Sequence, residues 1–269
     1  MDNAKQLVKD FWNQYSCGEQ LYMVGEDMKT KFKNQIQERM RLEPFITDFA
    51  DFSDWKDKDV LEIGVGLGAD HQLFAEHGAI LKGCDLTERA VEFTKQRFEL
   101  FDLHSELQVA DAEYLPYSNE QFDLVYSYGV IHVSPNTPKV VEEIYRVLKN
   151  KGVGKIMIYH KYSIVGFMLW IRYALLYGRP FRSLTEIYSK YLESPGTKAY
   201  SVKQANELFR NFFSINITTV LSHGDLLSSQ AGQRHGGFLL DLARIIHPRW
   251  IIKTFFPRYG LFMMVTLKK

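Results

Sequence analysis

The sequence predicts an α/β fold built on a mostly parallel sheet, and three observations carry this prediction. From Val60 onward, short apolar runs of strand length alternate with stretches of helical periodicity. The first run leads into three closely spaced glycines in VLEIGVGLGAD, residues 60–70, and the second run ends in Asp85. A strand, a glycine-rich turn and a helix in this order are typical of a ligand site at the edge of a parallel sheet.

Residues 1–54 are predicted to form an N-terminal helical cap. Apolar side chains recur at helical spacing between Leu7 and Trp12. A second pattern repeats every four residues from Met28 to Met40, until Pro44 ends it.

Residues 55–160 are predicted to form the core of the sheet. Five strands are expected in the runs VLEIGV, AILKGCD, SELQVAD, FDLVYSYGV and GKIMIYH. The stretch VEEIYRVLKNKG, residues 141–152, carries apolar residues on one helical face. It predicts a crossover helix that ends at Gly152, before the fifth strand.

The C-terminal half is predicted to contain two helical insertions. The first insertion is expected in residues 161–212 and is predicted to cover the substrate. It contains the apolar, aromatic stretch SIVGFMLWIRYALLYG. Residues 213–269 supply the last strands, FSINITTVLS and GLFMMVTLKK, around the second insertion FLLDLARIIHPRWIIKTFFPRYG.

Charge is divided unevenly along the chain although the formal net charge is only +1. Residues 1–150 carry 16 Lys and Arg against 27 Asp and Glu, a net charge of −11. Residues 151–269 carry 17 against 5, a net charge of +12. The basic half indicates an anionic partner, or the two halves neutralise each other across their contact. Only two cysteines and no apolar leader or membrane-length run are present, which favours the cytoplasm.

The glycine turn and two acidic residues are the candidate ligand contacts. Gly64, Gly66 and Gly68 permit positive φ and close approach of a ligand to the backbone. Asp85 follows Gly64 by 21 residues, a spacing that suits a carboxylate bonded to ribose hydroxyls. Glu62, within the first strand, needs a donor or cation, and a ligand ammonium group would serve.

Other readings of these residues stay open at this point. The glycines also fit a dinucleotide fingerprint, G-x-G-x-x-G/A, or a simple tight turn. Asp85 and Asp111 each precede a helical stretch and are also suited to cap a helix. Asp111, or the amide of Ala112, could otherwise bind an adenine amino group, for which a dinucleotide enzyme has less need.

Four motifs in this order resemble those of the class I S-adenosylmethionine-dependent methyltransferases that act on small molecules. They are VLEIGVGLGAD, GCDLTERAVEFTKQR, VADAEYLPYSNEQFDLVYSYGVIHVSP and EEIYRVLKNKG, and they cover roughly Trp55 to Tyr159. The resemblance implies a Rossmann-like, seven-stranded sheet whose last strand is antiparallel. It implies that the core binds S-adenosyl-L-methionine and releases S-adenosyl-L-homocysteine.

The resemblance also implies a role for each matching residue. The methionine part of the cofactor would lie against Glu62 and the turn at Gly64, Gly66 and Gly68, and the ribose against Asp85. The remaining contacts would be Leu86, Asp111 and Ala112 at the adenine, with Ser127 or Tyr128 beside the sulfonium.

The expected reaction is an in-line methyl transfer to a hydrophobic or aromatic small molecule, with anionic and lipid-linked acceptors included. His132 and His160 follow the fourth and fifth strands and are the candidate bases, although packing roles are open for both. The alternatives are an NAD(P)-dependent oxidoreductase and a non-catalytic, cofactor-binding adaptor at a membrane surface. The basic, apolar C-terminal region makes peripheral membrane contact an expectation, whereas no nucleic-acid module or metal-ligand spacing is visible. The acceptor atom and the oligomeric state are left open.

Overall fold

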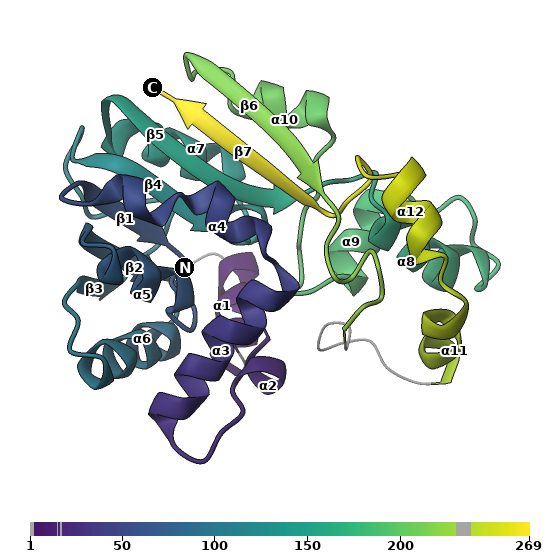
Figure 1. Ribbon diagram of the computed structural model, residues 1–269. Helices are drawn as coiled ribbons and strands as arrows, with labels where there is room; N and C mark the ends of the chain where they lie inside the picture. The colour runs from purple at the N-terminus through teal and green to yellow at the C-terminus, as the bar shows by residue number, and fades with distance from the viewer. Residues whose placement is uncertain (1–2, 15, 17, 230–237) are drawn as a thin grey trace.

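The computed structural model describes residues 3–14, 16, 18–229 and 238–269. Seven strands of these residues form one sheet in the order β3-β2-β1-β4-β5-β7-β6 (Figure 1). The strands are β1 Asp59–Ile63, β2 Ile80–Asp85, β3 Glu106–Val109, β4 Phe122–Tyr128, β5 Leu148–Tyr159, β6 Ser214–Val220 and β7 Phe262–Lys268. Strand β7 is antiparallel to both β5 and β6, and β1 to β5 pair in parallel. The predicted seven-stranded sheet with an antiparallel last strand is confirmed.

Helices cover both faces of the sheet and build a separate lobe beside it (Figure 1). The N-terminal helices are α1 Asn3–Gln14, α2 Glu19–Tyr22, α3 Met28–Leu42, α4 Phe45–Ala50 and η1 Phe52–Trp55. Within the core they are α5 Ala69–Glu76, α6 Glu88–Leu100, η2 Ile131–Val133 and α7 Thr137–Val147. The C-terminal half adds α8 Ile164–Trp170, η3 Ile171–Leu175, α9 Leu184–Tyr191, α10 Val202–Leu208, α11 Phe238–Ile246 and α12 Arg249–Phe255. None of the described helices has both the length and the apolar composition needed to cross a membrane.

Alternation along β1 shows how the sheet is buried on both faces. Leu61 and Ile63 pack in one cluster with the apolar face of α7 and with Ala205 of α10. Val60 packs in the opposite cluster with Phe74 of α5. Because side chains alternate along a strand, Glu62 points to the same face as Val60, toward α5. This places a carboxyl group under the turn that joins β1 to α5.

The crossover helix ends earlier than the sequence predicts. Helix α7 ends at Val147, and β5 begins at Leu148, not beyond Gly152. Leu148 is fully buried and pairs with Phe122 of β4. Lys149 reaches Asp59 at 2.7 Å and Asp123 at 2.8 Å, at the start of β1 and in β4. Burial of Leu148 in the core and these ion pairs favour an extended backbone over one more helical turn.

Asp225 joins the C-terminal lobe to the sheet. Its carboxylate is fully buried and accepts hydrogen bonds from the amides of Val165 (3.0 Å), Ser222 (2.8 Å) and Leu261 (2.8 Å). The Ser222 hydroxyl donates to it as well, at 2.7 Å. One side chain therefore supplies the hydrogen-bond acceptor for backbone amides in three segments that are far apart in sequence.

Replacing Asp225 with Ala is expected to destabilise the fold by about 3 kcal/mol or more, because each orphaned buried amide costs about 1–3 kcal/mol. Asp225→Asn keeps one acceptor oxygen and should fall between the wild type and the Ala variant. Urea denaturation at neutral pH measures both. Asp241→Ala, at a carboxylate that is 65% exposed, is the matched control and should stay within about 0.5 kcal/mol of the wild type. Equal stability of the Asp225 and Asp241 Ala variants would contradict the role given to Asp225.

Candidate cofactor site

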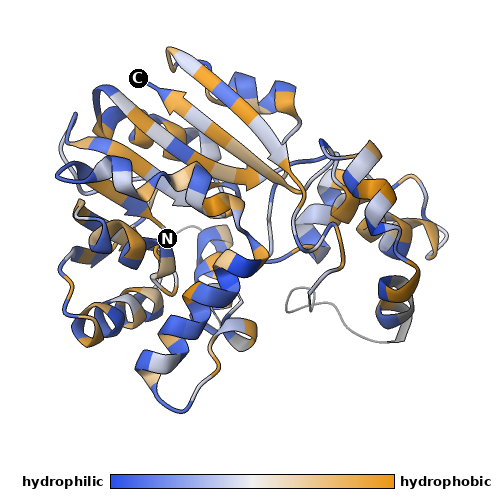
Figure 2. Cartoon of the chain, in the orientation of Figure 1, coloured by the Kyte–Doolittle hydropathy of each residue, from blue (hydrophilic) through white to orange (hydrophobic). Residues whose placement is uncertain are grey.

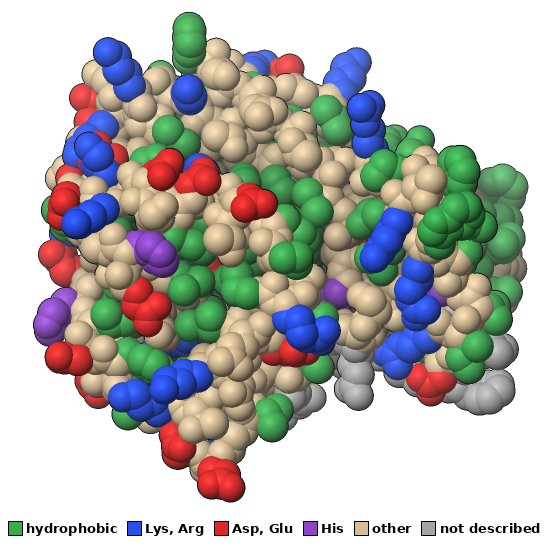
Figure 3. All heavy atoms as spheres, viewed as in Figure 1, with side chains coloured by type: hydrophobic (Ala, Val, Ile, Leu, Met, Phe, Trp, Pro, Cys, Tyr) green, Lys and Arg blue, Asp and Glu red, His purple; other side chains and the backbone are tan. Residues whose placement is uncertain are grey.

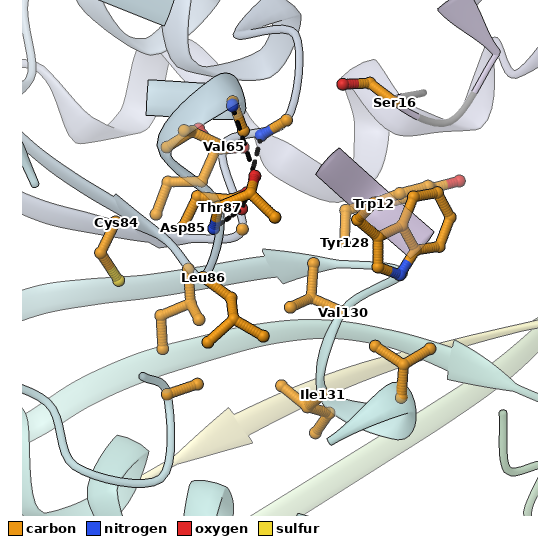
Figure 4. A pocket seen from close by; sticks show the side chains of 18 of the residues that line it. Trp12, Ser16, Val65, Cys84, Asp85, Leu86, Thr87, Tyr128, Val130 and Ile131 are labelled. Carbon is orange, nitrogen blue, oxygen red and sulfur yellow. Dashed lines mark hydrogen bonds between the residues drawn. The ribbon is translucent and has the colours of Figure 1, made fainter. Parts of the chain in front are cut away.

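A pocket lies at the carboxyl ends of β1, β2 and β4, and α1 closes it from outside (Figure 4). Its inner walls come from residues 62–70, 84–87, 110–112 and 128–135. Lys5, Val8 and Trp12 of α1 supply the outer wall, and Figure 4 places Trp12 across the pocket from Asp85. The carboxyl edge of a parallel sheet is where such folds bind their ligands.

The Asp85 carboxylate is fixed at the end of β2 by three donors. Its Oδ2 accepts from the Gly66 amide at 3.2 Å, and its Oδ1 accepts from the Thr87 amide (2.9 Å) and hydroxyl (2.8 Å). Burial raises the pKa of Asp85, although these hydrogen bonds favour its charged form. Thr87 caps helix α6 by accepting from the Ala90 amide at 3.3 Å. Asp85 is thus not the cap of α6, and its carboxylate lines the pocket.

The three glycines have different reasons to lack a side chain. All three have positive φ: +83° at Gly64, +54° at Gly66 and +75° at Gly68. A Cβ at Gly64 would lie 2.1 Å from a methyl of Val130, and one at Gly68 would lie 2.9 Å from Thr94. A Cβ at Gly66 would have no atom of the protein beyond its chain neighbours within 4 Å. The expectation that a ligand excludes all three side chains is therefore too broad, since the protein itself fills two positions and only Gly66 borders open space.

Glu62 has a protein partner that sequence analysis missed. Its Oε2 lies 2.9 Å from Nδ1 of His71, whose Nε2 lies 2.8 Å from the Ser105 hydroxyl. That hydroxyl donates its one proton to the Leu81 carbonyl at 3.0 Å, so His71 donates to it through Nε2. Burial lowers the pKa of His71 to about 3 and raises that of Glu62. Glu62 and His71 therefore share one buried hydrogen bond, and Glu62 already has a partner within the protein.

Asp111 ties the N-terminal cap to the core. Lys5 Nζ lies 2.5 Å from Asp111 Oδ2 and 2.7 Å from Glu113 Oε2. Burial opposes the charge on Lys5, but both carboxylates outweigh it and raise the lysine pKa. Leu86 and Ala112, the other residues predicted at this end, line the same pocket. The predicted adenine end is thus covered by α1.

Tyr128 lines the pocket, whereas Ser127 lies behind it. The Ser127 hydroxyl is fully buried and donates to the Ile63 carbonyl at 3.1 Å, which joins β4 to β1. The Tyr128 ring lies under the guanidinium of Arg39, 4.8 Å from its centroid. Its buried hydroxyl interacts with the buried Glu43 carboxyl, and burial raises the pKa of Tyr128.

The two predicted bases do not line this pocket. His132 is fully buried, its ring centroid is 4.1 Å from that of Tyr159, and neither ring nitrogen has a partner among the described residues. Burial and then the charge of Lys198 lower the pKa of His132 to about 3. His160 donates through Nδ1 to the Gly260 carbonyl at 3.2 Å. Their catalytic roles stay predictions.

The contribution of the N-terminal cap to the pocket was not predicted from the sequence. Lys5, Val8 and Trp12 follow one another at three and four residues and share one face of α1. A lysine on an otherwise apolar helix face was the available signal, because it needs a buried carboxylate. Arg39 of α3 was missed as well, and it pairs with Asp70 at 2.8 Å beside the glycine turn.

Known proteins resemble the chain across this site. Residues 61–155 match the family model described as a methyltransferase domain. A phthiotriol/phenolphthiotriol dimycocerosates methyltransferase of Mycobacterium leprae is 36% identical over 97 residues, 35% of each protein. A ubiquinone biosynthesis O-methyltransferase of Coxiella burnetii is 24% identical over 166 residues, 60% of this chain and 64% of that protein. The alignments thus span from about a third to just under two thirds of the length of these curated relatives.

Solved structures agree in fold over nearly the whole chain. A geranyl diphosphate C-methyltransferase from Streptomyces coelicolor A3(2), solved with Mg²⁺, geranyl diphosphate and S-adenosyl-L-homocysteine, has a TM-score of 0.61 at 15% identity. The superposition covers 99% of this chain and 97% of that one. A possible histamine N-methyltransferase from Thermotoga maritima gives a TM-score of 0.51 at 18% identity, over 89% and 97%. Residues 61–155 thus match a methyltransferase domain, and the chain as a whole shares its fold with solved methyltransferase structures.

The glycine turn provides a matched pair of variants. Gly66→Ala should weaken binding of S-adenosylhomocysteine at least tenfold, because the new methyl enters the open space of the pocket. Gly64→Ala should cost more thermal stability, because its methyl overlaps Val130, while the cost of positive φ is similar at both sites. Calorimetric titration and thermal melts measure the two effects. Unchanged affinity in Gly66→Ala would contradict the assignment of this space to the ligand.

Stability should fall as the solution is acidified below pH 6.5. In the fold, burial lowers the pKa values of His71 and His132 to about 3, so both side chains stay neutral. In the unfolded chain both become protonated below pH 6.5, which stabilises the unfolded state. His132→Phe removes one of these groups, so the variant should gain about 2 kcal/mol relative to the wild type between pH 7 and pH 5. Urea denaturation across this range measures the gain, and His104→Gln on the surface should show none. A pH-independent difference would contradict a neutral, buried His132.

Proposed function

We propose that the protein transfers a methyl group from S-adenosylmethionine to a hydrophobic or aromatic small molecule. The main support for this proposal is that Glu62, Gly66 and Asp85 line one pocket within the residues that match a methyltransferase domain. The NAD(P) alternative, which rested on the glycine spacing alone, has no support in the family match or in the related structures.

The pocket residues fit the cofactor that the domain implies. In this proposal Asp85 accepts hydrogen bonds from the ribose hydroxyls, the Gly66 backbone approaches the methionine part, and Asp111 with Ala112 lies at the adenine. When bound, the cofactor supplies an activated methyl carbon for in-line displacement. The residues of the chain then contribute mainly position, which is worth roughly 7–11 kcal/mol in favourable cases.

Tyr128 is the aromatic side chain of β4 that reaches the pocket wall. Its ring lies 6.0 Å from Phe262, which lies 6.1 Å from Tyr159. Phe262 and Tyr159 are buried in the core beside the lobe, so of these three rings Tyr128 alone faces the pocket. An apolar acceptor, lipid-linked molecules included, is supported by two relatives named for ubiquinone biosynthesis and for phthiotriol dimycocerosates.

Glu43 and His223 are further candidates to receive a proton from an acceptor hydroxyl, and like the predicted histidines they lie outside the lining of the cofactor pocket. Glu43 contacts Arg39, whose guanidinium covers Tyr128, and its Oε1 lies 3.8 Å from Nε2 of His223. The His223 side chain is 18% exposed, so an acceptor can reach it. Burial and the charge of Arg39 lower the pKa of His223, which keeps the imidazole neutral and able to accept a proton. Burial raises the pKa of Glu43, and in this proposal Glu43 orients the His223 ring.

Turnover should distinguish these residues. For a hydroxyl acceptor, His223→Asn and Glu43→Gln should each lower kcat by about 10²-fold with the affinity for S-adenosylhomocysteine unchanged. His104→Asn, at an exposed position on the core, is the control and should leave kcat unchanged. If His132→Phe abolishes turnover while His223→Asn retains it, the base is His132 and this assignment is wrong.

Assays with labelled methyl donor test the function itself. The purified chain is offered quinone, phenol, amine and lipid-linked acceptors, and label should pass to at least one apolar class. Label found only on small polar acceptors would contradict the apolar-acceptor proposal. Oxidation of an acceptor with NAD(P) and without label transfer would favour the oxidoreductase instead.

A further inference from the structure

Two segments of the C-terminal lobe, residues 161–183 and 238–259, expose large apolar side chains. The most exposed are Phe181 (99%), Ile245 (79%), Ile246 (72%) and Trp250 (72%). Others more than 40% exposed are Tyr162, Phe167, Leu175, Leu176, Tyr177, Ile251, Phe255, Phe256 and Tyr259. Single exposed apolar residues are ordinary, but a group of this size on one lobe marks a contact surface. We call these two segments the lobe surface.

The lobe surface is also strongly basic. Residues 161–183 contain four Lys and Arg and no Asp or Glu, and residues 238–259 contain four against the single acidic residue Asp241. Lys253 and Arg258 are exposed and form no salt bridge with any described residue. Figure 3 shows hydrophobic side chains gathered over the lobe with Lys and Arg beside them, whereas most acidic side chains lie over the core. Figure 2 shows the same apolar character on the ribbon of α12.

We infer that the lobe surface docks on an anionic lipid bilayer. Aromatic and aliphatic side chains beside Lys and Arg suit the boundary between headgroups and acyl chains, where the apolar atoms leave water and the cations meet lipid phosphates. A second copy of this chain is a poorer occupant, because two surfaces with an excess of positive charge repel each other. Charge complementarity therefore selects the bilayer.

The position of the lobe gives this docking a consequence for the acceptor. The Ile164 amide donates to the Tyr259 carbonyl at 2.9 Å, so the two segments are held together. Asp225 binds Val165 and Leu261, and His223 of the same loop faces Glu43. Docking would thus hold the acceptor side of the proposed site near the bilayer. This step rests on the proposed function, whereas the docking itself does not.

Co-sedimentation with vesicles tests the docking without any assay of activity. The full chain should sediment with phosphatidylcholine vesicles that contain phosphatidylglycerol at low salt. Its partition coefficient should fall at least tenfold with phosphatidylcholine alone. It should fall similarly at about 1 M salt, where the screening length is about 3 Å.

Two double variants address the apolar and the charged part separately. Trp250→Ser with Phe255→Ser, and Lys253→Glu with Arg258→Glu, should each lower the partition coefficient at least tenfold. The controls are Phe213→Ser, 90% exposed outside the lobe, and Lys95→Glu on α6, 46% exposed, which should stay within twofold of the wild type. Thermal melts establish that each variant is folded.

Three outcomes would overturn the inference. The first is a wild-type chain that stays in the supernatant with anionic vesicles at low salt. The second is binding that both double variants retain or that the controls lose equally. The third is a dimer in light scattering that Trp250→Ser with Phe255→Ser dissociates, with no vesicle binding by the wild type, which would assign the surface to a second copy. Methyl transfer in solution without vesicle binding would leave the proposed function standing while the docking fails.

Discussion

The hydrogen bond from the Gly66 amide to the Asp85 carboxylate is the contact on which the candidate site depends. It joins the turn after β1 to the end of β2, so the backbone of one strand positions the acidic side chain of the next. The parallel register of β1 and β2 brings both to the same edge of the sheet. A positive φ at Gly66 directs the amide to the carboxylate and leaves the other side of the glycine open.

Helix α1 covers the pocket at this edge of the sheet, and a group of charged side chains leads from the pocket to the C-terminal lobe. Helix α1 lies over the pocket because Lys5 binds Asp111 and Glu113, which holds the face with Val8 and Trp12 against the core. On the other side, Arg39 spans from Asp70 beside the glycine turn to Glu43, which faces the C-terminal lobe through His223. One network of charges thus connects the proposed cofactor end with the proposed acceptor end.

The sequence predicted the sheet and its pocket well because both depend on local patterns. Apolar alternation, three glycines and carboxylates at strand ends are visible within short windows, and Asp85 and Gly66 do lie together. Contacts between distant segments cannot be assigned from a short window, because a side chain that needs a partner, such as Lys5, does not identify that partner. The pairing of Glu62 with His71 needs the geometry of α5, and that of Lys5 with Asp111 spans 106 residues. The start of β5 at Leu148 was not predicted because the helical spacing of apolar residues continues through Leu148, which forms part of the strand in the structure.

Calorimetric titration of the wild type and Asp85→Ala with S-adenosylhomocysteine and with NAD tests whether the pocket at Asp85 and Gly66 binds the methyl-donor cofactor. The wild type should bind S-adenosylhomocysteine at one site, Asp85→Ala should weaken this binding at least tenfold, and NAD should give no heat of binding. Binding of NAD by the wild type, with none of S-adenosylhomocysteine, would contradict this assignment of the pocket.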